Sequence, residues 1–341
     1  MTAMTTGSPP ASLPAVPPGK NAGKDRANRT RSRRDARIGW AFLAPFAILF
    51  ALVFLAPIAV SLKASFFQQT VSGGSVYGGG ELVDKFVGLK NYADVVTSEL
   101  FWLGVGRVLL FGAVQIPVMI GGALLLALLL DSLVVRRVGF FRLSFFLPYA
   151  IPGIVAALVW TYIFSPVLSP INEGLSALSG VVSNLVGQPV DLTVDFFAPG
   201  TILGSMATMT TWTFTGYNML IFLAALLSIP GDLYEAARMD GAGEFAIVRW
   251  IKIPLVKRAA MLAVLLSIIG TIQLFTEPTV LATVNPWMGK AYTPMMMAYN
   301  SLTGTVSPSG DGPASAISIV MALLAALLAA AYAFAQRRSM D

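Results

Sequence analysis

The sequence predicts an all-α membrane protein with six transmembrane helices, and three observations lead to this prediction. Of the 341 residues, 56% are apolar and only 12% are charged, which is about half the charge, roughly 25%, that is usual in soluble domains. The mean hydropathy is +0.73. The apolar residues are also gathered into long runs. A run of about 20 residues crosses the roughly 30 Å hydrocarbon layer of a bilayer as a helix.

Six apolar segments are long enough to be such spans. Their approximate ranges are 39–62, 103–130, 140–164, 201–229, 260–283 and 314–335. Soluble buried helices of this length rarely occur six to a chain, so we expect residues 37–341 to form one transmembrane domain. The connections at 63–102, 165–200 and 284–313 are polar and contain Gly clusters and turn pairs, which predict irregular surface loops outside the membrane.

The positions of the basic residues predict the orientation of the spans. With both termini in the cytoplasm, 18 of the 23 Lys and Arg residues lie inside: eight on the N-terminal tail, three in the second connection, five in the fourth and two at the end. Retained loops carry this excess of positive charge. The alternative, a nucleic-acid-binding tail, is less favoured because the basic cluster adjoins a span and lacks interleaved aromatic residues. We therefore expect no nucleic-acid partner.

Residues 1–36 are rich in Pro, Ala, Ser, Gly and Arg and contain almost no large apolar residue. Such a segment buries too little apolar surface to offset the entropy of ordering, so we expect a disordered, basic cytoplasmic tail. A cleaved signal peptide is not favoured, because the apolar stretch that follows is too long and has no small-residue cleavage site after it.

The chain contains no Cys and no His. This excludes disulfides, thiol nucleophiles, imidazole bases and the usual zinc ligand sets. A nucleotide-binding loop would need Gly, four residues, then Gly-Lys-Ser/Thr, but the pair Gly289 and Lys290 is followed by Ala291. We expect a chain without catalytic residues, metal or cofactor, which does not hydrolyse ATP itself.

The segment at 231–258, between the fourth and fifth spans, is longer than a connector needs to be. Asp232 as cap and Glu235 three residues later predict a capping box, and Gly241 predicts a left-handed stop. A second amphipathic turn follows and is expected to end at Pro254. The residues alone leave two interpretations open: a helix held off the membrane that binds another protein, or a helix lying on the membrane surface.

This segment resembles the EAA loop of ABC-importer permeases, in which Glu-Ala-Ala is followed by three residues, Gly, nine residues and Ile-x-Leu-Pro. Ile253 replaces the Leu of the pattern, a change that conserves volume. The segment EAARMDGAGEF is similar to the MalF-like permease subunits of carbohydrate-uptake ABC importers, as are stretches from Gly139, Thr211 and Leu274. Residues at the motif positions are Glu235, Ala236, Ala237, Gly241, Ile251 and Pro254. Together with Asp240, which directly precedes Gly241, they are the residues that the resemblance implies couple the chain to an ATPase.

The resemblance covers roughly residue 38 to the C-terminus and implies the type I ABC importer permease fold with a cytoplasmic coupling helix. It implies a dimer of cytoplasmic ATPases, one copy contacting the helix around Glu235 to Gly241, a second MalG-like permease, an extracellular or periplasmic sugar-binding protein and a sugar as substrate. The motif does not specify which sugar. The chain departs from the family after the fifth span, where ATVNPWMGKAYTP replaces a Gly-Gly-Pro turn, and it lacks the large outer domain of some relatives.

Other function classes remain as alternatives. They are an ABC permease for a solute that is not a sugar, an ion-coupled secondary carrier, and a membrane-embedded enzyme. A carrier needs titratable groups within its spans, and here the spans offer only Glu277 and Arg107. An enzyme would need a catalytic constellation, which the sequence does not suggest.

Polar and aromatic residues within spans mark candidates for a substrate path, because such residues are costly against lipid. In the fourth span the candidates are Thr210, Trp212, Phe214, Tyr217 and Asn218, beside further threonines. Aromatic faces pack on sugar C–H surfaces, while hydroxyls and amides bind sugar hydroxyls. The alternative is helix packing through Thr hydrogen bonds.

Two further candidates lie in the fifth span. Gln273 and Glu277 are four residues apart and would share one helix face near the outer side. They are expected to line the path there. The alternative is an internal pair of Glu277, with Arg107 as its partner.

Overall fold

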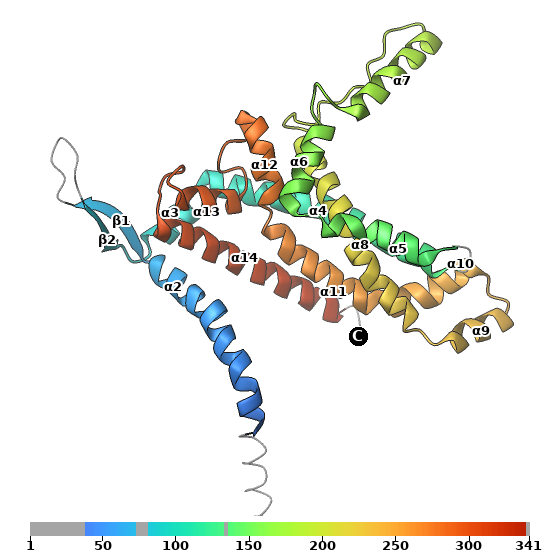
Figure 1. Ribbon diagram of the computed structural model, residues 1–341, viewed down its shortest axis with the longest axis horizontal. Helices are drawn as coiled ribbons and strands as arrows, with labels where there is room; N and C mark the ends of the chain where they lie inside the picture. Colours follow the sequence, from blue (N-terminus) through green and yellow to red (C-terminus); the bar gives the residue numbers. More distant parts are fainter. Residues whose placement is uncertain (1–37, 73–80, 133–135, 339–341) are drawn as a thin grey trace, which may run out of the picture. The chain divides into compact units, whose positions relative to one another are not determined.

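The computed structural model describes residues 38–72, 81–132 and 136–338. The predicted disordered tail at 1–36 lies outside these residues. The chain divides into two compact units, Met1–Val60 and Ser61–Asp341. Figure 1 shows the helices and strands along the chain.

The described part of the first unit is helical from Ile38 onward. The whole helix runs from Ile38 to Ala64. It contains the π turn η1 (Ala51–Leu55), and its last part is α2 (Ala56–Ala64). Its side chains are apolar and largely exposed, Trp40 and Phe42 among them. A helix that is apolar all round suits a lipid environment.

The second unit is built around long apolar helices, three of which are α4 (Glu99–Asp131), α8 (Ile202–Leu227) and α14 (Asp311–Arg338). In Figure 1, α4 and α8 run side by side. Within the described residues of the whole chain, five helices are long and apolar enough to cross a membrane, or six if one bent pair counts as a span.

That bent pair corrects the prediction of a continuous third span at 140–164. The segment forms α5 (Val138–Ala150) and α6 (Gly153–Ile163), which meet at an angle of 96°. The break falls at Ile151 and Pro152, which both have extended backbone conformations. A residue before proline is pushed out of the helical region by the proline ring, so a composition that suits a span does not make one straight helix here.

The expected irregular outer loops contain regular structure, which corrects a second prediction. The first loop forms an antiparallel hairpin of β1 (Phe67–Ser72) and β2 (Glu81–Phe86), in which Phe67 pairs with Phe86. Other outer elements are α3 (Lys90–Val96), α7 (Pro170–Val186), η3 (Pro286–Met288) and α13 (Pro294–Leu302). For α7 the sequence signal was present, because Ser169 caps it and Pro170 follows at the first helical position.

The fifth predicted span, 260–283, belongs to a longer apolar helix with internal breaks. It begins with α10 (Glu244–Ile247) and the π turn η2 (Val248–Lys252) and continues as α11 (Ile253–Ile272). The chain then bends and resumes as α12 (Thr276–Val284). Pro254 therefore does not end a helix as predicted. In the π turn before it, the amide of Ile253 bonds the carbonyl of Val248 five residues back, a geometry that accommodates the proline.

The connection before this helix contains α9 (Gly231–Met239). Its N-cap is Pro230, without a side-chain cap hydrogen bond, so the predicted capping box of Asp232 and Glu235 is absent. Pro230 has an extended conformation, and the helix begins at Gly231, two residues earlier than a cap at Asp232 predicts. Gly241 follows α9 with φ +84°, as the predicted left-handed stop requires.

Candidate substrate path and coupling segment

The candidate path residues of α8 lie on different faces of that helix. Thr210 and Asn218 are buried within the chain, with exposed fractions of 6% and 4%. Trp212 and Phe214 are exposed at 37% and 38%, and Tyr217 is half-buried. The structure therefore separates a set of aromatic side chains, which is open to a partner or substrate, from polar groups that face the chain's own core.

The threonine hydroxyls of α8 bond to their own helix. Thr208, Thr210, Thr213 and Thr215 donate to the carbonyls four residues back, at 2.5 to 3.1 Å. The Asn218 amide likewise donates to the Phe214 carbonyl at 3.0 Å and contacts the Met119 sulfur on α4 at 3.7 Å. The alternative, in which Thr hydrogen bonds join α8 to other helices, is wrong for these four residues, because the carbonyls of the preceding turn lie within reach and can accept a second hydrogen bond.

Aromatic residues of the broken third span join the exposed face of α8. Tyr149 at the end of α5 stacks on Tyr217 with ring centroids 4.8 Å apart, and its edge contacts Phe214 at 5.9 Å. Trp160 of α6 contacts Trp212 at 5.8 Å. Sequence reasoning missed Tyr149 and Trp160, although the flanking prolines at Pro148 and Pro152 marked that segment as irregular.

A glycine allows α5 and α8 to approach closely beside these rings. A Cβ added at Gly216 would lie 1.8 Å from the carbonyl oxygen of Phe145. No side chain fits at that separation, so the aromatic contacts depend on the absence of one at this position.

Gln273 and Glu277 do not share a helix face, because α11 ends at Ile272 and α12 begins only at Thr276. Gln273 is exposed and donates to the carbonyl of Ile269 at 3.3 Å. The alternative pairing of Glu277 with Arg107 is also wrong among the described residues. Arg107 donates to the Tyr292 carbonyl at 3.1 Å, and its guanidinium lies 4.4 Å from the centre of the Tyr292 ring.

The residues of the candidate coupling segment are mostly exposed. Glu235, Ala236 and Asp240 are open to solvent on α9, and Ala237 is half-buried. Across the turn at Gly241, Arg238 and Glu244 form an exposed ion pair at 2.9 Å. Ile251 and Pro254 lie in the helix that leads into the fifth span. The arrangement presents a short helix with small side chains next to the end of a span.

A buried ion pair lies behind this exposed segment. The Lys252 ammonium is 2.7 Å from the carboxylate of Asp131 at the end of α4, and the two side chains are only 8% and 12% exposed. The same ammonium lies 5.3 Å from the ring centre of Tyr234 on α9. Burial, and secondarily the negative charge of Asp131, raises the pKa of Tyr234 above its ordinary value.

The π turn explains why Lys252 is buried. Ile247, Lys252 and Val256 point into the protein, whereas Trp250 and Pro254 are exposed. A spacing of five residues between Ile247 and Lys252 needs the extra residue that a π turn inserts. Helical periodicity alone gives no sign of this, and the sequence identifies Lys252 only as one of the five basic residues of the fourth connection.

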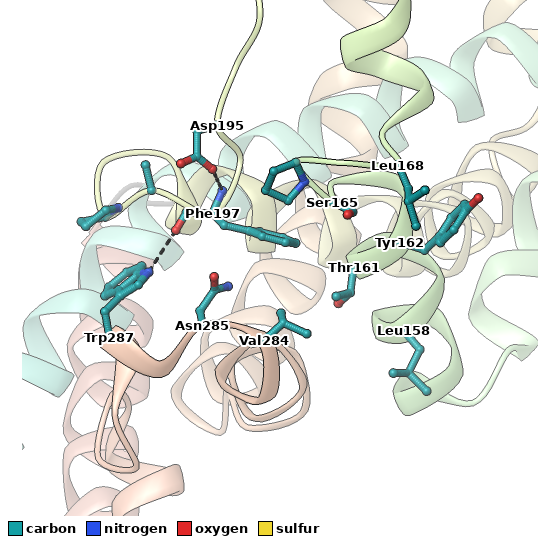
Figure 2. Close-up of a pocket in the computed structure, with 13 residues that line it drawn as sticks. Leu158, Thr161, Tyr162, Ser165, Leu168, Asp195, Phe197, Val284, Asn285 and Trp287 are labelled. Atoms are coloured by element: carbon teal, nitrogen blue, oxygen red, sulfur yellow. Dashed lines mark hydrogen bonds between the residues drawn. The ribbon is translucent and has the colours of Figure 1, made fainter.

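A pocket of about 660 Å³ opens where α6, the segment before α8 and the end of α12 meet (Figure 2). Tyr162, Phe197 and Trp287 line it with aromatic surface, and Asp195 lies at its edge. The Trp287 indole donates to the Phe197 carbonyl at 3.2 Å, and the Asp195 carboxylate accepts from the Phe197 amide at 2.9 Å. No pattern in the sequence indicates this pocket. Within the described part of the chain, no three acidic residues gather as a metal site.

The long apolar helices, with a short exposed helix beside one of them, define a multi-pass membrane protein. Residues 119–340 match the family of binding-protein-dependent transport system inner membrane components, and the chain belongs to this family. Its fold is that of a type I ABC importer permease, a multi-pass membrane protein.

Three relatives are informative. The lactose transport system permease LacF of Rhizobium radiobacter is 32% identical over 246 residues, covering 70% of this chain and 74% of the relative. The sulfoquinovosyl glycerol permease SmoG of Agrobacterium fabrum is 28% identical, covering 87% and 90%. The trehalose/maltose permease MalF of Thermococcus litoralis is 28% identical, covering 85% and 90%.

Among solved structures, a chain of a bacterial alginate ABC transporter, in complex with a periplasmic protein that holds an alginate pentasaccharide, has the same fold. The TM-score is 0.67 at 18% identity, over 91% of this chain and 98% of that chain. A second structure of a bacterial alginate importer gives a TM-score of 0.64 at 19% identity.

Proposed function

We propose that the chain is the permease subunit of an ATP-driven sugar importer and forms the translocation path together with a second, MalG-like permease. The family match over residues 119–340 carries this proposal. The names of the relatives support a carbohydrate substrate, since they are permeases for lactose, sulfoquinovosyl glycerol and trehalose or maltose. In this proposal both termini are cytoplasmic, and a sugar-binding protein delivers substrate to the outer face.

Energy enters through α9 in this proposal. One subunit of a cytoplasmic ATPase dimer binds the exposed residues from Glu235 to Gly241, where Ala236 and Ala237 let its surface approach the helix backbone. Glu235 and Asp240 orient it by charge. Closure of the ATPases on ATP moves α9, and the bundle changes from inward-facing to outward-facing. Ile251 and Pro254 form the start of the helix that follows this movement.

The substrate path follows the aromatic face of α8. Trp212, Phe214 and Tyr217 are accessible and adjoin Tyr149 and Trp160, which gives flat surfaces suited to sugar rings. Exposed Gln273 and the nearby Glu277 provide polar groups toward the outer end. Thr210 and Asn218, also proposed from the sequence, face the chain's own core in this conformation and contribute to the path only by supporting the aromatic face.

Co-purification from native membranes tests the proposal. The tagged chain should bring with it an ATPase and a second permease, and vesicles containing the complex should take up radiolabelled lactose, maltose or trehalose only with ATP present. Uptake by the chain alone, driven by an ion gradient and abolished by a protonophore, would instead show a secondary carrier. ATP-dependent complexes that respond to none of the three sugars would show a permease for another solute.

Alanine variants test the path. Replacing Trp212, Tyr217 or Gln273 by Ala should lower sugar uptake while ATP hydrolysis and complex assembly remain, because these side chains are accessible. The matched control is Leu227→Ala, an exposed residue at the far end of α8, which should leave uptake unchanged. Wild-type uptake in all three path variants would refute this assignment.

A further inference from the structure

Three residues distant in the sequence meet behind the coupling segment: Asp131 on α4, Lys252 on η2 and Tyr234 on α9. We refer to them as the inner anchor. The ion pair of Lys252 and Asp131 joins two long helices at 2.7 Å, and the Tyr234 ring brings α9 to the same ammonium at 5.3 Å. This distance is within the roughly 6 Å at which a cation attracts an aromatic face.

We propose that the inner anchor makes α9 move as one body with the inner ends of α4 and α11. This inference rests on the proposed function, because it assigns α9 as the helix on which the ATPase acts. Glu235, Ala236 and Asp240 are exposed for that contact, whereas Tyr234, between them and the bundle, is the residue of α9 that touches the buried charge. The three residues are positioning residues: they hold α9 and do not contact substrate.

Burial makes this connection stiff. Both side chains of the ion pair are almost inaccessible, so water does not weaken their attraction as it does for the exposed pair of Arg238 and Glu244. Separating Lys252 from Asp131 would leave a charge unpaired in a site of low polarity. The pair therefore favours one relative position of the two helices over a continuous range of positions. The ion pair holds α4 to η2, and the Tyr234 ring attaches α9 to this pair, so a displacement of α9 reaches two spans.

The ring of Tyr234 provides this contact, and its hydroxyl does not. The hydroxyl oxygen is buried and has no hydrogen-bond partner among the described residues. Tyr234→Phe should therefore keep the anchor and Tyr234→Leu should break it. Lys252→Arg keeps the cation and is the conservative variant. The double variant Lys252→Met with Asp131→Leu removes both charges without leaving either one buried alone, so it should fold.

Distances between spin labels test the proposal in the purified complex. The chain has no cysteine, so labels placed at Asp232→Cys on α9 and Leu129→Cys on α4 are specific within this chain. Both positions are exposed. Without anchor changes, we expect one narrow distance that is the same in the resting complex and after trapping with ATP and orthovanadate. Tyr234→Phe and Lys252→Arg should give the same narrow distance.

Tyr234→Leu and the double variant should lose the single narrow distance and hydrolyse ATP without sugar uptake. Narrow distances and coupled uptake in both variants would overturn the proposal, because a merely structural ion pair is replaced well by apolar side chains. A shift of the label distance on trapping in the chain with an intact anchor would overturn it as well. If no ATPase co-purifies with the wild type, the proposed function fails, while the label distances at rest still decide whether the anchor holds α9.

Discussion

The two ends of α4 are held to the rest of the second unit in different ways. At the inner end, Asp131 is bound by the buried ammonium of Lys252. At the outer end, Arg107 lies over Tyr292 and bonds its carbonyl, beside an apolar cluster that includes Val108, Met288 and Met296. Both ends also pack into apolar clusters, the inner end through Ala123, Ala127 and Leu130, so the buried ion pair is what distinguishes the inner end.

This difference indicates a division of roles along one helix. Apolar packing is spread over many atoms, and each contact is weak, so the packing at both ends resists displacement as a whole. A single ion pair is strong only in one geometry, so it can pass a movement between the parts that it joins. We therefore expect changes at the outer end to lower stability and changes at the inner end to lower coupling.

The largest effect is expected at an outer contact of α14. A Cβ at Gly312 would lie 1.8 Å from the carbonyl oxygen of Phe67, and no rotamer relieves an overlap with backbone. Gly312→Val should destabilise the unit by at least about 3 kcal/mol and lower the amount of folded chain, measured by gel filtration of a fluorescent fusion. Gly106→Ala, where a Cβ meets nothing within 4 Å, is the control. Equal amounts of both folded variants would contradict a tightly packed outer end.

The second largest effect is expected at the turn after α9. Gly241 has φ +84°, which costs an L side chain roughly 1 to 2 kcal/mol. Gly241→Val should shift the helix and uncouple ATP hydrolysis from sugar uptake, with normal protein levels. Gly243→Ala, at φ −75°, keeps a permitted conformation and should stay coupled. Normal uptake by Gly241→Val at wild-type levels would show that this turn does not take part in coupling.

Arg107 tests the role assigned to the outer end of α4. Arg107→Met removes the hydrogen bond and the contact with the Tyr292 ring, which together contribute on the order of 1 to 2 kcal/mol. The melting temperature of the purified complex should fall, while the number of ATP molecules hydrolysed per sugar stays the same. Arg107→Lys should lose less, since it keeps the cation. A changed coupling ratio at unchanged stability would reverse the roles assigned to the two ends.

The smallest effect is expected at the exposed ion pair of α3. Lys90 and Asp94 are 2.8 Å apart in an i, i+4 arrangement, but water reaches both. Lys90→Ala should change stability by no more than about 0.5 kcal/mol and should not affect coupling. Comparison of its melting curve with that of the wild type checks this. A loss as large as that of the Arg107 variant would mean that exposure does not set the strength of ion pairs in this protein.

Local patterns predicted much of the fold. Apolar runs located the helices α4, α8 and α14, and Gly241 marked the end of α9. The same patterns did not predict where a helix breaks within an apolar run, as it does at Pro152 and between Ile272 and Thr276. They also failed at Pro254, because a π turn lets the helix pass through it.

The candidate site was predicted only in part. The motif from Glu235 to Gly241 could be recognised because its residues are contiguous, and the aromatic residues of α8 stood out in an apolar helix. The ring stack of Tyr149 on Tyr217 and the pocket at Trp287 could not be foreseen, since each joins segments whose separation in space no spacing in the sequence reveals.

The sequence by itself determined the protein class, the number of apolar segments and the motif of the coupling segment, because these depend on composition and local spacing. Only the tertiary structure decided where the third span breaks, which face of α8 is open and which charges meet. Lys252 and Asp131 are 121 residues apart in the sequence, and a one-residue π insertion turns the lysine inward. Long-range pairing depends on such small rotations, which helical periodicity does not encode.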